Sequence, residues 1–281
     1  MISSKKYVDE TLKANNLVAN KSLGQNFLVE SEIAIEIVNS ANIDKDTCVI
    51  EIGPGLGALT EIALEKAGLV KAFEIDKNMV NILSKTFAEK ENFQITNIDF
   101  LKVDIEELIT SINQSGYEKI VVLSNLPYYI TSKLLNKILV NNYNIKSIVA
   151  MMQKEVGLKI LKPEKKDYNL LSVILDYQFD VSIVKYVGKN SYLPRPEIDS
   201  IVLKFERTNP KYDVNFNQLL KVSECLFSQR RKTVNNNLKT LLTSEQLVEC
   251  FNLCNILPTT HIEQLLINDI VNIAKYIEKN A

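Results

Sequence analysis

The segment Thr47-Cys48-Val49-Ile50-Glu51-Ile52-Gly53-Pro54-Gly55-Leu56-Gly57-Ala58 decides the fold of this 281-residue chain. Its first six residues are rich in β-branched side chains and predict a buried strand, and the residues after the glycines have helical spacing. Glycines let the turn bring main-chain amides close to a ligand, and the N-terminus of the following helix adds positive potential. The pattern is typical of a strand–turn–helix unit that binds a nucleotide or nucleoside.

Strands and helices continue to alternate after this unit. Strands are predicted over Thr47–Ile52, Leu69–Ile75, Phe93–Ile98, Lys119–Ser124 and Lys146–Met152, and helices over Ala58–Ala67, Asn78–Lys90 and Thr131–Asn141. This alternation predicts a parallel sheet covered by helices. Two more helices are expected over Gln153–Leu161 and Tyr168–Phe179, followed by a closing strand pair over Asp180–Val187 and Ser200–Phe205.

A domain boundary is predicted at Thr208-Asn209-Pro210, because proline biases its predecessor away from helix. The chain beyond it shows no strand alternation. Helical periodicity instead covers Phe216–Leu226, Val234–Leu242, Glu245–Leu253 and Ile262–Ile277. We therefore expect an α/β domain over residues 1–207, with an N-terminal extension over 1–45, and a small all-helical domain over 208–281.

Composition narrows the class of protein. The net charge of −1 argues against tight nonspecific duplex binding, which depends on neutralising phosphates. No apolar run reaches the roughly 18 residues of a membrane span, and the polar N-terminus lacks a secretory apolar region. The four cysteines form no paired framework, which suits the cytoplasm. Cys250, Cys254 and His261 lack a fourth zinc ligand, so no metal is expected.

Acidic residues lie at the ends of three successive predicted strands: Glu51, Glu74 and Asp99. Their carboxylates complement the amines, hydroxyls and positive charge of S-adenosylmethionine, and Asp104 is a rival to Asp99 deeper in its loop. The glycine spacing also satisfies the dinucleotide pattern, so a nicotinamide enzyme is a competing interpretation. The carboxylate within the first strand favours S-adenosylmethionine, since dinucleotide folds usually need only apolar residues there.

Asn125-Leu126-Pro127-Tyr128 follows the fourth predicted strand. This tetrapeptide offers an amide side chain, a main-chain carbonyl beside a rigid proline, and an aromatic face. Together these groups recognise a planar ring with an exocyclic amine, such as adenine. The alternative is that Leu-Pro only ends the strand and Tyr128 packs in an ordinary way.

The chain resembles N6-adenine methyltransferases and, more closely, the KsgA-type small-subunit (16S) rRNA adenine dimethyltransferases. The motifs that carry the resemblance appear in the family's order and spacing. They are Lys21-Ser22-Leu23-Gly24-Gln25-Asn26-Phe27-Leu28, Glu51–Gly57, Asn125–Tyr128, Met152-Gln153-Lys154-Glu155-Val156, Pro194-x-Pro196-x-Ile198-Asp199-Ser200 and Phe227-Ser228-Gln229-Arg230-Arg231-Lys232-Thr233. This match covers the chain from about residue 20 to about residue 242.

The resemblance implies a Rossmann-like class I methyltransferase domain that uses S-adenosylmethionine and no metal. It implies N6,N6-dimethylation of two adjacent adenosines near the 3′ end of 16S rRNA, in the assembling 30S subunit, by a cytoplasmic monomer that serves ribosome biogenesis. The cofactor would contact Asn26, Leu28, Gly53, Gly55, Glu74, Asp99 and Asn125. The target base would lie against Asn125, Leu126, Pro127, Tyr128 and Tyr192, and RNA against Arg230, Arg231 and Lys232.

Two residues depart from the family pattern. Tyr129 replaces the usual asparagine after the Asn-Leu-Pro-Tyr motif, and Tyr192 replaces the usual phenylalanine before the Pro-x-Pro segment. Tyr192 keeps an aromatic face, so stacking on a flipped base is expected to survive.

Three other functions remain open at this point. A large-subunit rRNA methyltransferase of the antibiotic-resistance type would share the fold and the chemistry, although that group more often has isoleucine at position 126. A ribosome-assembly factor would bind immature small subunits as its main role. A transcription-factor-like descendant of the fold would have lost the Asn125–Tyr128 motif, which this chain retains.

Overall fold

The computed structural model describes residues 1–127, 130–140 and 143–280, and its contacts divide the chain into two compact units. The first unit contains residues 1–161 and 181–207, and the second contains 162–180 and 208–281. The segment Lys162–Asp180 therefore belongs with the C-terminal helices, whereas the sequence-based boundary at residue 207 assigned it to the first domain.

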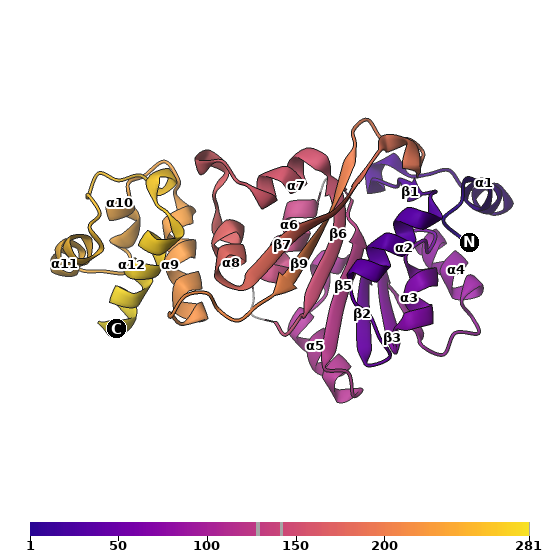
Figure 1. The fold of residues 1–281 in the computed structure, drawn as a ribbon, viewed down its shortest axis with the longest axis horizontal. Helices are drawn as coiled ribbons and strands as arrows, with labels where there is room; N and C mark the ends of the chain where they lie inside the picture. Colours follow the sequence, from indigo (N-terminus) through magenta and orange to yellow (C-terminus); the bar gives the residue numbers. More distant parts are fainter. Residues whose placement is uncertain (128–129, 141–142, 281) are drawn as a thin grey trace. The chain divides into compact units, whose positions relative to one another are not determined.

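The first unit is built on a seven-stranded sheet with the order β4-β3-β2-β5-β6-β9-β7 (Figure 1). The strands are β2 (Thr47–Ile52), β3 (Leu69–Glu74), β4 (Phe93–Asn97), β5 (Lys119–Asn125), β6 (Ser147–Gln153), β7 (Phe179–Val187) and β9 (Ser200–Arg207). The five strands from β2 to β6 are parallel, as predicted, and β9 pairs antiparallel with β6. The expected closing pair is confirmed, because β7 and β9 are neighbours at one edge.

Helices flank this sheet and bury its apolar side chains. The helices of the first unit are α1 (Lys5–Ala14), α2 (Ser31–Ser40), α3 (Thr60–Lys66), α4 (Lys77–Thr86), α5 (Ile105–Gln114), α6 (Thr131–Leu139) and α7 (Lys154–Leu161), with short 3₁₀ turns η1 (Lys21–Leu23), η2 (Phe100–Lys102) and η4 (Lys189–Ser191). Side chains alternate between the two faces of each strand. Val49, Val121 and Val149 thus share one face, and they pack with residues of α2, α3 and α4 in one apolar core.

A two-stranded antiparallel sheet joins distant parts of the first unit. It pairs β1 (Phe27–Leu28) with β8 (Tyr192–Leu193), with Phe27 opposite Leu193 and Leu28 opposite Tyr192. This pairing places the N-terminal motif directly beside the segment that precedes the Pro-x-Pro sequence.

The second unit is helical. It contains η3 (Lys165–Asp167), α8 (Leu170–Gln178), α9 (Phe216–Ser228), α10 (Val234–Leu238), α11 (Ser244–Cys254), η5 (Ile262–Gln264) and α12 (Ile267–Lys279). Within this unit α9 contacts α8, α10 and α12, and α11 contacts α12. Leu219, Val222 and Leu226 on α9 are buried, as are Ile270, Ile273 and Ala274 on α12. Among the described residues, no helix is long and apolar enough to cross a membrane.

Candidate functional site

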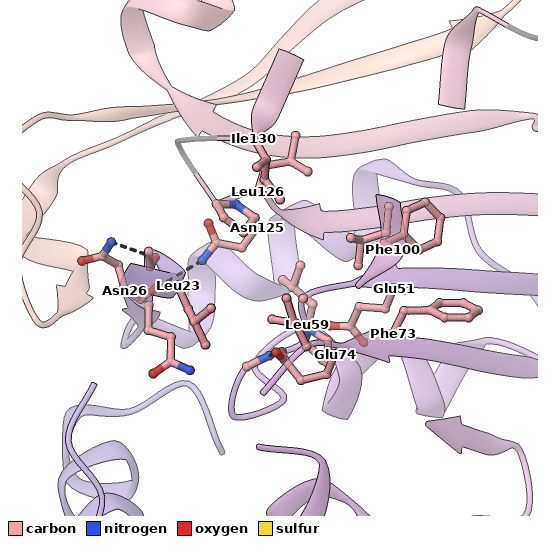
Figure 2. A pocket seen from close by; sticks show the side chains of 18 of the residues that line it. Leu23, Asn26, Glu51, Leu59, Phe73, Glu74, Phe100, Asn125, Leu126 and Ile130 are labelled. Carbon is pink, nitrogen blue, oxygen red and sulfur yellow. Dashed lines mark hydrogen bonds between the residues drawn. The ribbon is translucent and has the colours of Figure 1, made fainter. Parts of the chain in front are cut away.

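A pocket in the first unit opens at the carboxyl ends of β2, β3 and β5 (Figure 2). The chain runs outward from β2 to β3 and β4 on one side, and β5 and β6 lie on the other. This is the point where the strand order reverses, which is where open α/β sheets bind their ligands. Glu51 and Glu74 lie on one side of the pocket, and Asn26 and Asn125 lie on the other.

The glycine turn after β2 forms the floor of the pocket. Gly53, Gly55 and Gly57 have φ angles of 67°, 59° and 92°, a region that side-chain-bearing residues rarely adopt. A Cβ on Gly57 would lie 2.8 Å from Leu83 Cδ2, whereas a Cβ on Gly53 would meet no protein atom within 4 Å. Gly57 therefore permits packing against α4, while Gly53 leaves open space beside the pocket that a ligand can fill.

Glu51 is a buried carboxylic acid at the carboxyl end of β2. It is 1% exposed, and its Oε2 accepts a hydrogen bond from Thr60 Oγ1 at 2.7 Å. Burial is the main reason why the pKa of Glu51 is raised to about 7; the hydrogen bonds from Thr60 act against this rise, and the nearby Glu74 carboxylate adds to it. A group poised in this way can take or release a proton near neutral pH when a charged ligand arrives.

Glu74 is fixed by main-chain amides at the end of β3. Its Oε2 accepts from Gly55 N at 3.2 Å, and its Oε1 accepts from Asp76 N at 2.9 Å. Burial raises the pKa of Glu74 above its ordinary value. Each carboxylate oxygen keeps a further lone pair, so the two can also accept from neighbouring ribose hydroxyls.

The structure separates the two candidates that follow β4. Asp99 lines the pocket, and its Oδ1 accepts from Leu101 N at 2.9 Å. Asp104 instead caps the N-terminus of α5, with its Oδ1 accepting from Glu107 N at 3.0 Å. The choice of Asp99 over Asp104 is therefore consistent with their positions.

Asn125 lies at the end of β5 and turns its amide in a defined direction. Its Nδ2 donates to the main-chain carbonyl of Asn26 at 3.2 Å (Figure 2). Because a carbonyl only accepts, this bond assigns the side-chain nitrogen to Asn26 and leaves Oδ1 free to accept from a ligand. Leu126 and Pro127 continue the pocket wall, and Leu126 N donates to Met151 O at 2.9 Å. Tyr128 and Tyr129 lie outside the described residues.

The N-terminal motif closes another side of the pocket. Asn26 and Leu28 both line it, and Asn26 Nδ2 donates to Gly24 O at 3.1 Å. Tyr192, opposite Leu28 in the β1–β8 pair, is 3% exposed, and its hydroxyl donates to Met151 Sδ at 2.9 Å. The sulfur of Met151 is thus one partner of the hydroxyl that distinguishes this residue from phenylalanine.

Several residues that line the pocket were not predicted, and Ile2 is the most distant of them in sequence from any predicted motif. Ile2 lines the pocket, is 6% exposed, and donates its main-chain amide to Glu61 Oε2 at 2.8 Å. The apolar residues Phe73, Phe100 and Leu101 were also missed as lining residues, although two of them border predicted carboxylates. No local pattern near Ile2 signals this contact, because its partner lies on α3.

The predicted RNA-contacting residues Arg230, Arg231 and Lys232 lie in the second unit, in the turn after α9, and all three are exposed. Arg230 already has partners, since its Nη2 donates to Lys166 O at 2.7 Å and to Tyr168 O at 2.8 Å. Among the described residues, no cluster of three or more histidine, cysteine or acidic side chains is arranged to hold a metal ion.

The sheet order and the carboxylate-lined pocket at its reversal point define a Rossmann-like methyltransferase fold. Residues 16–279 match the model of the ribosomal RNA adenine dimethylase family, and the chain belongs to that family.

Relatives and solved structures agree with this placement. The chain is 38% identical to the ribosomal RNA small subunit methyltransferase A of Macrococcus caseolyticus, over 92% of this chain and 90% of the relative. It is 37% identical to the protein of the same name from Moorella thermoacetica, over 95% of each. A dimethyladenosine transferase from Plasmodium falciparum has a similar fold, with a TM-score of 0.67 and 23% identity over 90% of this chain and 97% of that one. The 23S rRNA methyltransferase ErmE gives a TM-score of 0.64 at 20% identity, over 90% and 100%.

Proposed function

We propose that this protein transfers methyl groups from S-adenosylmethionine to N6 of two adjacent adenosines near the 3′ end of 16S rRNA, dimethylating each in the assembling 30S subunit. The observation that carries the proposal is the direction of the Asn125 amide, which leaves Oδ1 free to accept from an exocyclic amine. The names of the relatives, small subunit methyltransferase A, support the choice of RNA.

The pocket residues suit the proposed cofactor. Glu74 would accept from ribose hydroxyls, and Asp99 would accept from the adenine amine of the cofactor. The open space beside Gly53 would admit the methionine moiety, and Asn26 and Leu28 would complete the wall. When bound, the cofactor supplies an electrophilic methyl group on a sulfonium.

The chain's own contribution is alignment of the target nitrogen. The N6 lone pair of adenine is delocalised into the ring and is a poor nucleophile. Hydrogen bonds from N6–H to Asn125 Oδ1 and to the Leu126 carbonyl would favour a pyramidal nitrogen and direct its lone pair at the methyl. The proton would leave after transfer, when the nitrogen is cationic, so no general base is required. For the second methylation, one acceptor is enough, because one N–H remains.

The target base must leave its stack to reach this pocket, at a cost of a few kcal/mol. Tyr128 would stack on the flipped base and return roughly 1–3 kcal/mol for that contact. Tyr192 is 3% exposed and does not line the pocket, so its ring would have to be uncovered before it could stack on the base as well. Arg231 and Lys232 would contact RNA phosphates, and we propose that the protein acts in the cytoplasm as a monomer without an obligate protein partner or a metal.

The test is methyl transfer from labelled S-adenosylmethionine to undermethylated 30S subunits, with 50S subunits and free rRNA in parallel, followed by nucleoside analysis. We expect dimethyladenosine on 30S subunits only. Label on 50S subunits would favour a large-subunit enzyme of the resistance type. Binding to 30S without any label would leave an assembly factor on a methyltransferase scaffold.

A further inference from the structure

The loop that precedes α8 is fixed to the turn that follows α9. Arg230 lies 64 positions after Lys166 in the sequence, yet its Nη2 donates to the carbonyls of both Lys166 and Tyr168. The ring of Tyr168 lies 6.4 Å from the ring of Phe227, and its hydroxyl donates to Asp176 Oδ2 at 2.7 Å. The loop is therefore held by hydrogen bonds and ring packing within the second unit.

Hydrogen bonds within the second unit also stabilise the turn that carries Arg230. Asn237 is 4% exposed, and its Nδ2 donates to Leu226 O at 2.9 Å and to Gln229 O at 3.4 Å. Lys232 N donates to Gln229 O at 2.9 Å, which closes the turn. The carbonyls of Leu226 and Gln229 at the end of α9 thus have donors within the unit, which gives the turn a defined shape.

Both segments present cations that are not engaged with acids. Lys162 and Lys165 on the loop, and Arg231 and Lys232 on the turn, are exposed and form no ion pair within the described part of the chain. Lys166 differs, because it pairs with Glu164 at 2.8 Å. The side chain of Arg230 reaches from the turn to the loop, so the two segments that carry the four cations lie next to each other.

We propose that Lys162, Lys165, Arg231 and Lys232 form one basic surface that binds the phosphate backbone of ribosomal RNA. In this proposal Arg230 is a positioning residue, which holds the loop before α8, with Lys162 and Lys165, in that surface. The inference rests on the proposed function, which supplies an RNA partner. It adds a second RNA-contacting segment, and it gives Arg230 a role different from that of its neighbours. Phosphate contacts fix the register of a protein on RNA without reading its sequence.

Unpaired cations suit this role because they release counterions from RNA without first breaking an intramolecular ion pair. Lys166 would have to leave Glu164 to do the same. The same positive surface could attract an acidic protein segment. RNA differs in its salt dependence, since each phosphate contact on a single strand adds about 0.7 to the slope of log affinity against log salt.

The experiment measures binding of the full-length protein to undermethylated 30S subunits across a salt series. The double variant Lys162→Glu/Lys165→Glu is compared with Lys221→Glu/Lys279→Glu, which makes the same change in net charge at exposed lysines outside the surface. We expect the first to weaken binding about tenfold or more and to lower the salt slope by roughly 1 to 2, and the second to change little. Equal losses from the two double variants would overturn the proposal, as would no loss from the first.

The role of Arg230 is separated from that of Arg231 by a matched pair, Arg230→Ala and Arg231→Ala, since each removes one positive charge. We expect Arg230→Ala alone to speed hydrogen exchange of the Asp167 and Tyr168 amides, which donate to Glu164 O. In the Lys162→Glu/Lys165→Glu background, Arg230→Ala should weaken 30S binding little further, because the loop has no cations left to position. Arg231→Ala should still weaken 30S binding in that background by the same factor as it does in the otherwise wild-type protein.

The positioning role is wrong if hydrogen exchange is the same in the two alanine variants, or if their effects in that background are alike. Circular dichroism and thermal unfolding report whether the second unit, which carries every one of these substitutions, is folded in each variant. Methylation by the wild-type protein tests the proposed function separately, because the surface is judged only by the ratio of variant to wild-type binding.

Discussion

The amide of Asn125 donates to the main-chain carbonyl of Asn26 at 3.2 Å, across 99 positions of sequence. One hydrogen bond therefore connects the end of β5 with the N-terminal motif and sets which atom of the amide faces the pocket. If Asn125 accepts from the target amine as proposed, this recognition depends on Asn26, which need not touch the amine.

Replacement of Asn125 tests this arrangement. We expect Asn125→Ala to lower methyl transfer at least 100-fold while cofactor affinity falls only a fewfold, because one acceptor of the target amine is lost. Single-turnover transfer to 30S subunits and calorimetric titration with S-adenosylhomocysteine measure the two effects. Asn125→Asp keeps acceptor oxygens but cannot donate to Asn26 O, so it should also be impaired. Near-normal turnover in the alanine variant would rule out the assigned role.

Glu51 should make the free energy of unfolding depend on pH, and the sign of this dependence follows from its pKa. The pKa is about 7 in the folded protein and 4.5 as the ordinary value, so between these pH values the folded state holds a proton that the unfolded state has lost. The free energy of unfolding should therefore fall as pH rises through this window, by roughly 3 kcal/mol, and level off above it. Denaturation of cofactor-free protein at several pH values measures the slope.

Two variants check that the slope belongs to Glu51. Glu51→Gln should reduce the slope to the part that Glu74 contributes, since the pKa of Glu74 is also raised by burial, whereas the same change at the exposed Glu65 should leave the slope intact. An unchanged slope in Glu51→Gln would assign the dependence to another group. Because a cationic ligand favours the ionised carboxylate, we also expect wild-type affinity for S-adenosylmethionine to rise from pH 6 to pH 8.

Two glycines of the turn after β2 can be compared, because a side chain at Gly57 would clash with the protein and one at Gly53 would fill space open to a ligand. Gly57→Ala places a Cβ 2.8 Å from Leu83 Cδ2 at a positive φ, so we expect a loss of about 2–4 kcal/mol in stability. Gly53→Ala has open space and should cost about 1 kcal/mol for its backbone conformation alone. The affinity for S-adenosylhomocysteine should nevertheless fall about tenfold in Gly53→Ala. Unchanged affinity there would place the ligand away from Gly53.

The hydroxyl of Tyr192 has a sulfur partner, and sulfur is a weak acceptor. We expect Tyr192→Phe to keep nearly full transfer activity and to lose less than about 1 kcal/mol in stability. Steady-state kinetics and thermal unfolding check both. A collapse of turnover with little change in stability would show that the hydroxyl acts directly on the RNA.

Local patterns were enough to predict the central strands, the glycine turn and the carboxylates that follow the strands. Their positions follow from period-two alternation and from the rule that parallel strands end at one edge. Helix α5 was missed because Asp104 was weighed as a ligand rather than as a helix cap, although Glu107 three positions later is a start signal. The contact of Ile2 with Glu61, the β1–β8 pairing and the grouping of Lys162–Asp180 with the C-terminal helices depend on long-range packing, which no local window contains.

The β1–β8 pairing also has a consequence for how the protein is made. Leu28 and its neighbours line the pocket, but the strand that pairs with them ends at Leu193, 165 positions later (193 − 28). At about 5–20 residues per second, translation needs roughly 10–30 seconds to cover that distance. During this interval the nascent chain has β1 without its partner. The pocket is therefore completed late in synthesis, and a truncated chain that stops before Leu193 lacks the strand that supports Phe27 and Leu28 in the pocket wall.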